Sequence, residues 1–561
     1  MKTLFTAILA ATITFSLLAG NNPVERIFVS TDREVYIAGD VVLCSLFCVD
    51  LQGNPSNASA VSYLELVSSD GTATESKIGL LGGRGAGSFR IPVSTSTGIY
   101  RLIAYTSSNT NETGTPWIVG SRILTIFNTL SAAKVRDGVE IVDEDEYLSL
   151  KRDPDINCGK IQISSTVRVL KDSEYTIFLN NKGVGADLSL SVYHEDDIVP
   201  ARQETSMEGF LNALSSFNPE FSGSRQVDYD GEIISARING NITDNNDKVV
   251  ATLSSAGAPS NLYIGVTDND KVRFFTNNIY GDREIVCEVS NVDFGKGSID
   301  IESPFIGAGA GKLPQLQMNR IIQKDLSARK VALRSGNTMR LDTLSSLLRH
   351  REDLLLETSS CKHYHLDNFV RFPSIREVLV EIIPYVSLRR EKGKQKLVMI
   401  ATDAMDYYKA SVDNLLVMMD GVVITDLGLL LEFDAMLIED VDVYTQAIAC
   451  GNVSFSGIVN FVTKKNYVTT LSFPDNVKVV DFKGVSYPVA YYGGTPPEGV
   501  EDVRQLLYWD PVLRLASGEN KRLVLHTPGY AGTFRAVAEG MADDGTPIHY
   551  EFTFEVVDSK E

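Results

Sequence analysis

Short segments in which apolar and polar residues alternate occur along most of the chain. The phrases YLELV, SFRIPV and GIYRLIAYT lie between about residues 23 and 128, separated by Gly- and Ser-rich turns. A period of two is typical of a β-strand with one buried face. The pattern returns in KIQISSTVRVL, in ARINGNITD and in HYEFTFEVV near the end. Short, regularly spaced strands of this kind predict β-sandwiches, so we expect a mainly β, multidomain protein.

Helical spacing is confined to two regions. Residues 312–360 are rich in helix formers, and SLLRHREDLLLETSS places leucines at helical intervals, which predicts a helical connector. In FPSIREVLVEIIP, Ser374 and Glu377 have the spacing of a capping box. Pro384 then ends the helix that this box begins.

A small α+β unit follows this second helix. KLVMIATD predicts a strand, and LLVMMDGVVITD predicts a second strand with a turn at Asp420 and Gly421. We expect a short helix near residues 434–439 and two further strands, at residues 441–444 and 458–463. The predicted fold class is therefore tandem β-sandwiches with one small α+β domain.

The phrases of this unit resemble the plug domain of TonB-dependent outer-membrane receptors. The resemblance covers residues 366–467 and rests on the proline-terminated helix, the DG turn, the IEDVDV phrase and the ending GIVNFVTKK. The residues that carry it, and that the resemblance marks as structural or interaction positions, are Asp420, Gly421, Glu439, Gly457, Lys464 and Lys465. A receptor barrel of about 22 strands with at least roughly 9 residues each does not fit into the part of the chain after Lys465, so we expect no transporter in this chain alone.

Two other resemblances set the expected domain order. VSTDREVYIAGD and GIYRLIAYT resemble the opening and closing strands of a macroglobulin-type domain at residues 23–128, and residues 475–561 look like another. Residues 228–300 resemble a carboxypeptidase regulatory-like domain, and residues 156–200 predict a second, smaller sandwich. The combined order is similar to a Bacteroidetes family of exported proteins that combine macroglobulin-type domains with a barrel-less plug.

The ends and the charge of the chain restrict its location and its partners. Residues 1–20 contain Lys2, an apolar stretch and small residues before a polar start, which predicts a secretory signal peptide. No later stretch is long and apolar enough to predict a transmembrane helix. With 72 acidic and 52 basic residues, the net charge of −20 makes a nucleic-acid partner improbable. We expect an exported protein in the periplasm or at the outer membrane, or at the cell surface.

Candidate chemistry is sparse. ACGN at residues 449–452 lacks the Glu and Gln of a macroglobulin thioester, and HEDDI at residues 194–198 lacks the second histidine of a zinc-protease helix. GAGAGKL at residues 307–313 does not have P-loop spacing and predicts a flexible hinge. HYH at residues 363–365 places two imidazoles on one face of a strand, but no ligand partner is recognised in the sequence, so a polar surface feature is expected. Cys44 and Cys48 are too far apart on one strand for a disulfide and are expected to be buried thiols.

No catalytic, cofactor-binding or metal-binding residue is therefore predicted, and no cofactor. The leading hypothesis is a non-enzymatic scaffold or protein-binding protein of the cell envelope, with other envelope proteins as partners. The alternative is an accessory that supplies its plug-like unit to a separately encoded TonB-dependent barrel. A hydrolase site formed between domains is the third possibility, because the six histidines leave a triad formally open.

Overall fold

The chain folds into two compact units, each made of segments that are distant in sequence. Unit 1 comprises residues 1–229, 305–348 and 485–561, and unit 2 comprises residues 230–304 and 349–484. The computed structural model describes residues 23–130, 139–151, 157–223, 225–242, 250–256, 261–277, 279–290, 292–342, 344–347, 361–391, 394–400, 411–412, 414–450, 453–494 and 501–558.

The first part of unit 1 is a sandwich with the strand order β1-β3-β6-β5-β4-β7-β8-β2. The long strand β5 pairs with β4 over most of its length and with β6 at Leu80 and Leu81, so the sheet folds over into two layers. The apolar residues of both layers meet in one core, to which Cys44 and Cys48 contribute as free, buried thiols, as predicted. The strands are β1 (Arg26–Thr31), β2 (Val35–Ile37), β3 (Val41–Val49), β4 (Val61–Ser68), β5 (Gly71–Leu81), β6 (Arg84–Arg90), β7 (Gly98–Tyr105) and β8 (Arg122–Phe127).

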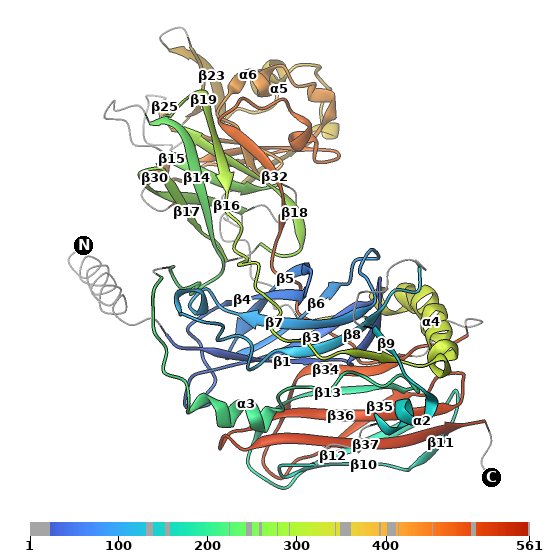
Figure 1. Cartoon of the computed structure of the whole chain (residues 1–561). Coiled ribbons are helices and arrows are strands. Elements are labelled where there is room, and N and C mark those ends of the chain that lie inside the picture. The colour runs from blue at the N-terminus through green and yellow to red at the C-terminus, as the bar shows by residue number, and fades with distance from the viewer. Residues whose placement is uncertain are drawn as a thin grey trace. The chain divides into compact units, whose positions relative to one another are not determined.

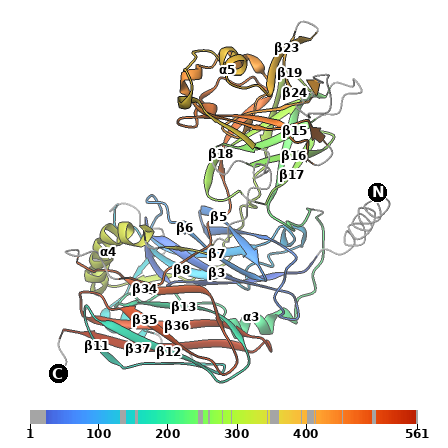
Figure 2. The same ribbon diagram turned by 180° about the vertical axis from the view of Figure 1, so that it is seen from behind.

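The second sandwich of unit 1 combines four strands of residues 161–195 with four strands of residues 506–557. A three-stranded layer has the order β10-β12-β35 and a five-stranded layer has the order β11-β37-β36-β13-β34. In Figure 1 and Figure 2 the teal strands of residues 161–195 lie beside the red C-terminal ones. The strands are β10 (Ile161–Ser164), β11 (Arg168–Leu170), β12 (Glu174–Asn181), β13 (Ala186–Glu195), β34 (Leu506–Leu515), β35 (Asn520–His526), β36 (Gly532–Ala542) and β37 (Pro547–Val557).

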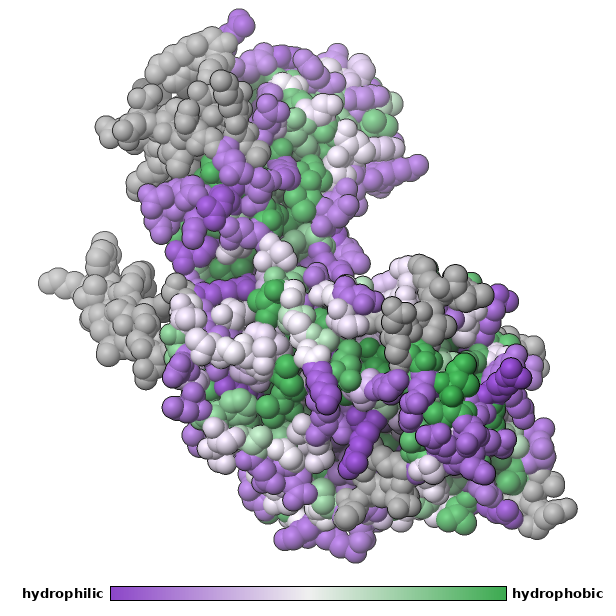
Figure 3. Space-filling view, in the orientation of Figure 1, coloured by the Kyte–Doolittle hydropathy of each residue, from purple (hydrophilic) through white to green (hydrophobic). Residues whose placement is uncertain are grey.

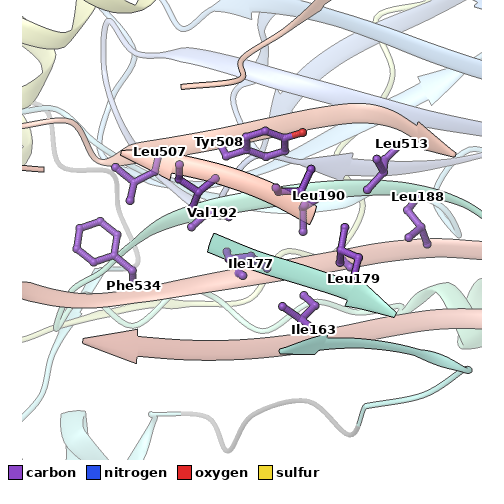
Figure 4. Packing of buried hydrophobic residues seen from close by; sticks show 14 of the residues in the cluster. Ile163, Ile177, Leu179, Leu188, Leu190, Val192, Leu507, Tyr508, Leu513 and Phe534 are labelled. Carbon is purple, nitrogen blue, oxygen red and sulfur yellow. The ribbon is translucent and has the colours of Figure 1, made fainter. Parts of the chain in front are cut away.

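The core of this second sandwich contains residues from strands β10 to β13 and from strands β34 to β37. Figure 4 shows Ile163, Ile177 and Leu179 of the three-stranded layer beside Leu190 and Phe534 of the five-stranded layer. The prediction of one sandwich at residues 156–200 and another at residues 475–561 is therefore wrong in its boundaries. Strands β10 and β12 lie in one layer and β11 and β13 in the other, so residues 161–195 supply only part of each layer, and β34 to β37 complete both.

The glycine-rich segment at residues 307–313 is held against the first sandwich rather than forming a flexible hinge. The buried carboxylate of Glu65 accepts hydrogen bonds from the amides of Ile306 (3.1 Å) and Ala308 (3.0 Å). The buried Arg101 donates to the carbonyl of Ala310 at 2.7 Å. Glycine serves here because Gly307 and Gly311 have φ of 61° and 64°, which other residues rarely adopt.

Helices of unit 1 lie at the margins of these sheets. The 20-residue helix α4 confirms a helix in the predicted connector, but β21 follows it, and the leucine-rich phrase from residue 348 to residue 359 lies outside the described residues. No helix of the described ranges is long and apolar enough to cross a membrane. The elements are α2 (Glu144–Ser149), α3 (Met207–Leu214), α4 (Gln323–Asp342), β9 (Val139–Ile141), β20 (Leu316–Met318), β21 (Ser345–Ser346) and β33 (Val489–Ala490).

Unit 2 contains a seven-stranded sheet with the order β19-β14-β17-β16-β15-β18-β32. Strand β32 pairs with β18 along its whole length, so the stretch after residue 475 begins in unit 2 and not in the predicted C-terminal sandwich. The strands are β14 (Ile233–Ile242), β15 (Val250–Ser255), β16 (Asn261–Asp268), β17 (Lys271–Phe275), β18 (Asp282–Ser290), β19 (Val292–Ile301) and β32 (Val477–Lys483).

The α+β part of unit 2 has a five-stranded sheet with the order β22-β28-β31-β26-β27. Helices α5 and α6 lie beside one another (Figure 1), and their apolar residues share a core with β26, β28 and β31. The predicted capping box of α5 is present, with Ser374 and Glu377 bonding each other's backbone amides. The elements are β22 (Cys361–His365), α5 (Ile375–Glu381), β23 (Val386–Glu391), β24 (Lys394–Ile400), β25 (Ser411–Val412), β26 (Leu416–Met419), β27 (Val422–Val423), α6 (Leu427–Leu431), β28 (Ile438–Tyr444), β29 (Ile448–Cys450), β30 (Val453–Phe455) and β31 (Ile458–Thr463).

Candidate functional site

The Asp420–Gly421 turn connects β26 to β27 and stabilises the α+β part. Both residues have positive φ, 48° and 81°, and Met419 pairs with Val422 across them, as a tight hairpin turn requires. Asp420 is buried, and its carboxylate accepts from the Thr463 amide and hydroxyl, each at 2.6 Å, and from the Val468 amide at 3.2 Å. All of its contacts are internal, so Asp420 holds the fold together.

Gly457 is explained by close packing. A Cβ at this position would lie 2.5 Å from the carbonyl oxygen of Tyr444 and 2.4 Å from Cε of Met399. Any larger residue would push the start of β31 away from the end of β28, so glycine is required for the sheet and carries no chemistry.

Glu439 owes its position to an irregularity in the pairing of β28 with β31. The register shifts between Ile438 and Asp440, while Ile438 and Val441 are both buried. An extra residue in one strand of a pair re-aims the side chains next to it. Glu439 and Asp440 are therefore both placed outside the core, as partly exposed neighbours.

Two histidines of β22 face these carboxylates. His363 is the direct partner of Asp442 and His365 is the direct partner of Asp440 in the antiparallel pairing of β22 with β28. Each histidine donates from Nδ1 to its aspartate at 2.7 Å. The bond to Asp442 raises the pKa of His363, because it favours the charged imidazolium. We call His363, His365, Glu439, Asp440 and Asp442 the histidine–carboxylate face.

Sequence reasoning missed this face, although part of the signal was present. The expected polar surface role of HYH assumed that no ligand partner lies nearby, whereas strand pairing brings in carboxylates from 75 and 79 residues further along the chain. Cys361 was also overlooked, although it precedes His363 by two residues and so lies on the same side of β22. Its Sγ is 4.0 Å from Oδ1 of Asp442.

Lys464 and Lys465 follow β31 and belong to a second surface. The Lys464 amide donates to the carbonyl of Leu437, and the Arg371 guanidinium donates to the carbonyl of Met436 at 2.9 Å. These bonds bring together three chain segments that carry exposed apolar and basic side chains. We call this surface the basic–apolar end, made of Phe369, Val370, Arg371, Met436, Lys464 and Lys465.

The other sequence candidates form no site among the described residues. His194 of HEDDI packs between the rings of Tyr530 and Phe534, and burial lowers its pKa. Gly451 and Asn452 of ACGN lie outside the described residues. On the second sandwich, a groove of about 690 Å³ is lined mainly by hydroxyl and apolar side chains, with no histidine or cysteine among them. Within the described ranges, one group of three potential metal ligands comes together, namely His365, Glu439 and Asp440.

Fold and site together define a mainly β protein of tandem sandwiches with a small α+β part, and the predicted fold class is confirmed at that level. On the face shown in Figure 3, hydrophilic and hydrophobic residues are intermixed. No protein-family model and no curated protein matches the chain.

The solved structures that align with most of this chain include two bacterial α-2-macroglobulins. That of Salmonella, reacted with methylamine, has a TM-score of 0.23 and 10% identity over 95% of this chain and 39% of its own. That of Escherichia coli, activated by trypsin, has a TM-score of 0.22 and 9% identity over 96% of this chain and 42% of its own. This chain therefore spans less than half the length of either one, and TM-scores this low carry no argument about its fold or function.

Proposed function

We propose that the protein is a non-enzymatic, protein-binding scaffold of the cell envelope, and that it contacts its partner through the basic–apolar end. The observation that carries this proposal is the exposure of Phe369, Val370 and Met436, which are 43%, 76% and 42% exposed, beside Lys464 and Lys465. Neighbouring exposed apolar side chains mark surfaces that another protein covers.

The charge of this end also favours a protein partner. The whole chain carries a net charge of −20, whereas Lys464 and Lys465 are consecutive, exposed basic residues at this end; Arg371 is paired with Asp367. Two exposed lysines on an acidic protein attract an acidic surface of a partner. The apolar side chains would then supply most of the contact energy.

Two further points support a role in binding rather than in catalysis. Asp420 and Gly457, which stood out in the sequence, both serve the internal packing of unit 2. The signal-peptide pattern of residues 1–20 supports an exported protein, in the periplasm or at the outer membrane.

The proposal is tested by a crosslinking pull-down of the tagged full chain from its native envelope, with mass spectrometry to map the crosslinked lysines. We expect Lys464 and Lys465 to crosslink to one envelope protein, and the double variant Val370→Asp, Lys464→Glu to recover it at least about tenfold less efficiently, since an apolar hot spot is worth about 2 kcal/mol.

The matched control is Val93→Asp, which changes a valine of unit 1 that is also well exposed. Equal recovery of the partner by the double variant and the wild type, or crosslinks from unit 1 alone, would overturn the proposal. If the crosslinked protein is a TonB-dependent barrel, the accessory-plug alternative replaces the scaffold as the proposed function.

A further inference from the structure

The histidine–carboxylate face gathers more donor groups than a surface ion pair uses. His363 and His365 are two residues apart on β22, so both imidazoles lie on one side of the strand. Asp440 and Asp442 have the same spacing on β28 and face them directly. The bulge at Glu439 adds a third carboxylate beside Asp440.

Asp440 is the centre of this arrangement. Its Oδ1 is 2.7 Å from Nδ1 of His365 and 3.5 Å from Nε2 of His363. In a tetrahedral site with bonds of about 2.0–2.1 Å to nitrogen and oxygen, neighbouring ligand atoms are about 3.3 Å apart. Donor atoms of His365, Glu439 and Asp440 all lie within 4.8 Å of one another. These separations exceed the tetrahedral distance by up to about 1.5 Å, so side-chain rotations draw the donor atoms together when they hold one ion.

Asp442 occupies the place of an orienting carboxylate. It accepts from Nδ1 of His363 at 2.7 Å, which leaves Nε2 of the same ring, 3.5 Å from Oδ1 of Asp440, as the nitrogen that can bind a metal ion. A carboxylate on the far nitrogen of a ligating histidine fixes the ring and raises its basicity. His363 is 58% exposed, so the face is accessible from solvent.

We propose that this face binds a divalent transition-metal ion, with Zn²⁺ as the best match. The ligands are Nε2 of His363, Nδ1 of His365 and one carboxylate oxygen each from Asp440 and Glu439, and Asp442 is a positioning residue. When the ion binds, it replaces the hydrogen bond between His365 and Asp440, and the Nδ1 proton is released to solvent. Two imidazoles with carboxylates suit zinc and its neighbours, whereas calcium and magnesium prefer oxygen ligands alone. The proposal is independent of the partner-binding role of the basic–apolar end.

The test is Zn²⁺ binding to the full mature chain after treatment with a chelator, followed by calorimetry and by Co²⁺ substitution. We expect one saturable Zn²⁺ site per chain, an increase in melting temperature with added Zn²⁺, and the visible absorption of tetrahedral Co²⁺. The melting temperature rises because an ion that binds only the folded state stabilises it by mass action.

Variants assign the ligands. His365→Gln and Asp440→Asn should abolish the Co²⁺ absorption, and Asp442→Asn should weaken Zn²⁺ binding about 10- to 100-fold while leaving one site. Glu432→Gln, which changes an exposed carboxylate of unit 2 outside the face, is the matched control and should bind as the wild type does. Cys361→Ser should also bind normally, because its thiol lies beside Asp442 and not beside Asp440.

Three results would overturn the proposal: no saturable binding by the wild type, unchanged binding by His365→Gln or Asp440→Asn, or loss of binding in Cys361→Ser. Melting curves recorded without metal show whether each variant is folded. A variant that melts like the wild type in the absence of metal is folded, so its loss of binding reports on the ligand and not on the fold.

Discussion

Buried carboxylates in this protein differ in whether the fold supplies them with enough partners. Glu65 receives two backbone amides and Asp420 receives two amides and a hydroxyl. Glu288 of β18 is also buried, and burial raises its pKa to about 7 although Thr425 and Asn476 donate hydrogen bonds to it. Such a carboxyl is more stable protonated in the folded state.

Replacing Glu288 by glutamine should therefore remove a pH dependence of unit 2. The folded-state pKa of about 7 lies above the usual 4.5, so the native state binds the proton more tightly and the free energy of unfolding falls as pH rises from about 4.5 to 7. Above pH 7.5 we expect Glu288→Gln to be more stable than the wild type by about 2–3 kcal/mol. Urea unfolding at pH 5 and pH 8 measures the difference.

Glu284→Gln, which changes an exposed glutamate of the same strand, is the control and should leave the pH dependence unchanged. A Glu288→Gln variant that loses stability with pH as steeply as the wild type would show that Glu288 is not the group responsible.

At the scale of elements, one side chain connects three pieces of the α+β part. Asp420 lies at the turn between β26 and β27, and it accepts from Thr463 at the end of β31 and from Val468 in the 3₁₀ turn that follows. The position of that turn thus depends on a carboxylate more than forty residues earlier in the chain.

Asp420→Ala should destabilise unit 2 by about 2–4 kcal/mol, because the buried amides of Thr463 and Val468 lose their acceptor. Thermal unfolding of the full chain, with hydrogen exchange at β31 to assign the loss to unit 2, measures the effect. Asp475→Asn, at an exposed position of the same unit, should change the stability little. A stability loss below about 0.5 kcal/mol for Asp420→Ala would contradict the assigned role.

Local elements were predictable where one short phrase determines them. The strand at residues 458–463, the Asp420–Gly421 turn and the Ser374 capping box are all present as predicted. The helix expected near residues 434–439 is only a 3₁₀ turn at Ala435–Leu437, and the α-helix is α6, earlier in the same apolar phrase. Leucine-rich runs this short do not distinguish helix from strand, so its position was set by packing against α5.

The candidate metal site could not be predicted in the same way. Period-two spacing places His363 and His365 on one side of β22, but the sequence does not reveal that β22 pairs with β28. The bulge at Glu439 is equally hidden, because it depends on the register with β31. Both facts belong to long-range pairing, which a local pattern does not encode.

At the scale of the whole molecule, the second sandwich of unit 1 is completed only by the last part of the chain. Strand β13 lies between β36 and β34, and β12 lies between β10 and β35. The strands at residues 161–195 thus have C-terminal strands on both of their layers.

A chain that ends at Gly494 should therefore leave β12 and β13 unfolded. Hydrogen exchange should show their amides unprotected, because β13 loses both of its neighbouring strands, β12 loses β35, and the core loses the residues of β34 to β37. The amides of β31 in unit 2 provide the internal control and should stay protected, and a chain ending at Asp558, which keeps every strand, should behave as the full chain does. Protection of β12 and β13 in the shortened chain would show that residues 156–200 form a sandwich by themselves.

Because each unit is built from segments that are distant in sequence, the protein should tolerate a single proteolytic cut between its units. The chain passes from one unit to the other four times, after Tyr229, Pro304, Leu348 and Gly484. A cut in any one of these connections leaves three covalent links between the units, while each unit holds its own severed segments through shared sheets and cores. The two units of a molecule with one cut thus remain joined, and unit 2 is released only when all four connections are cleaved.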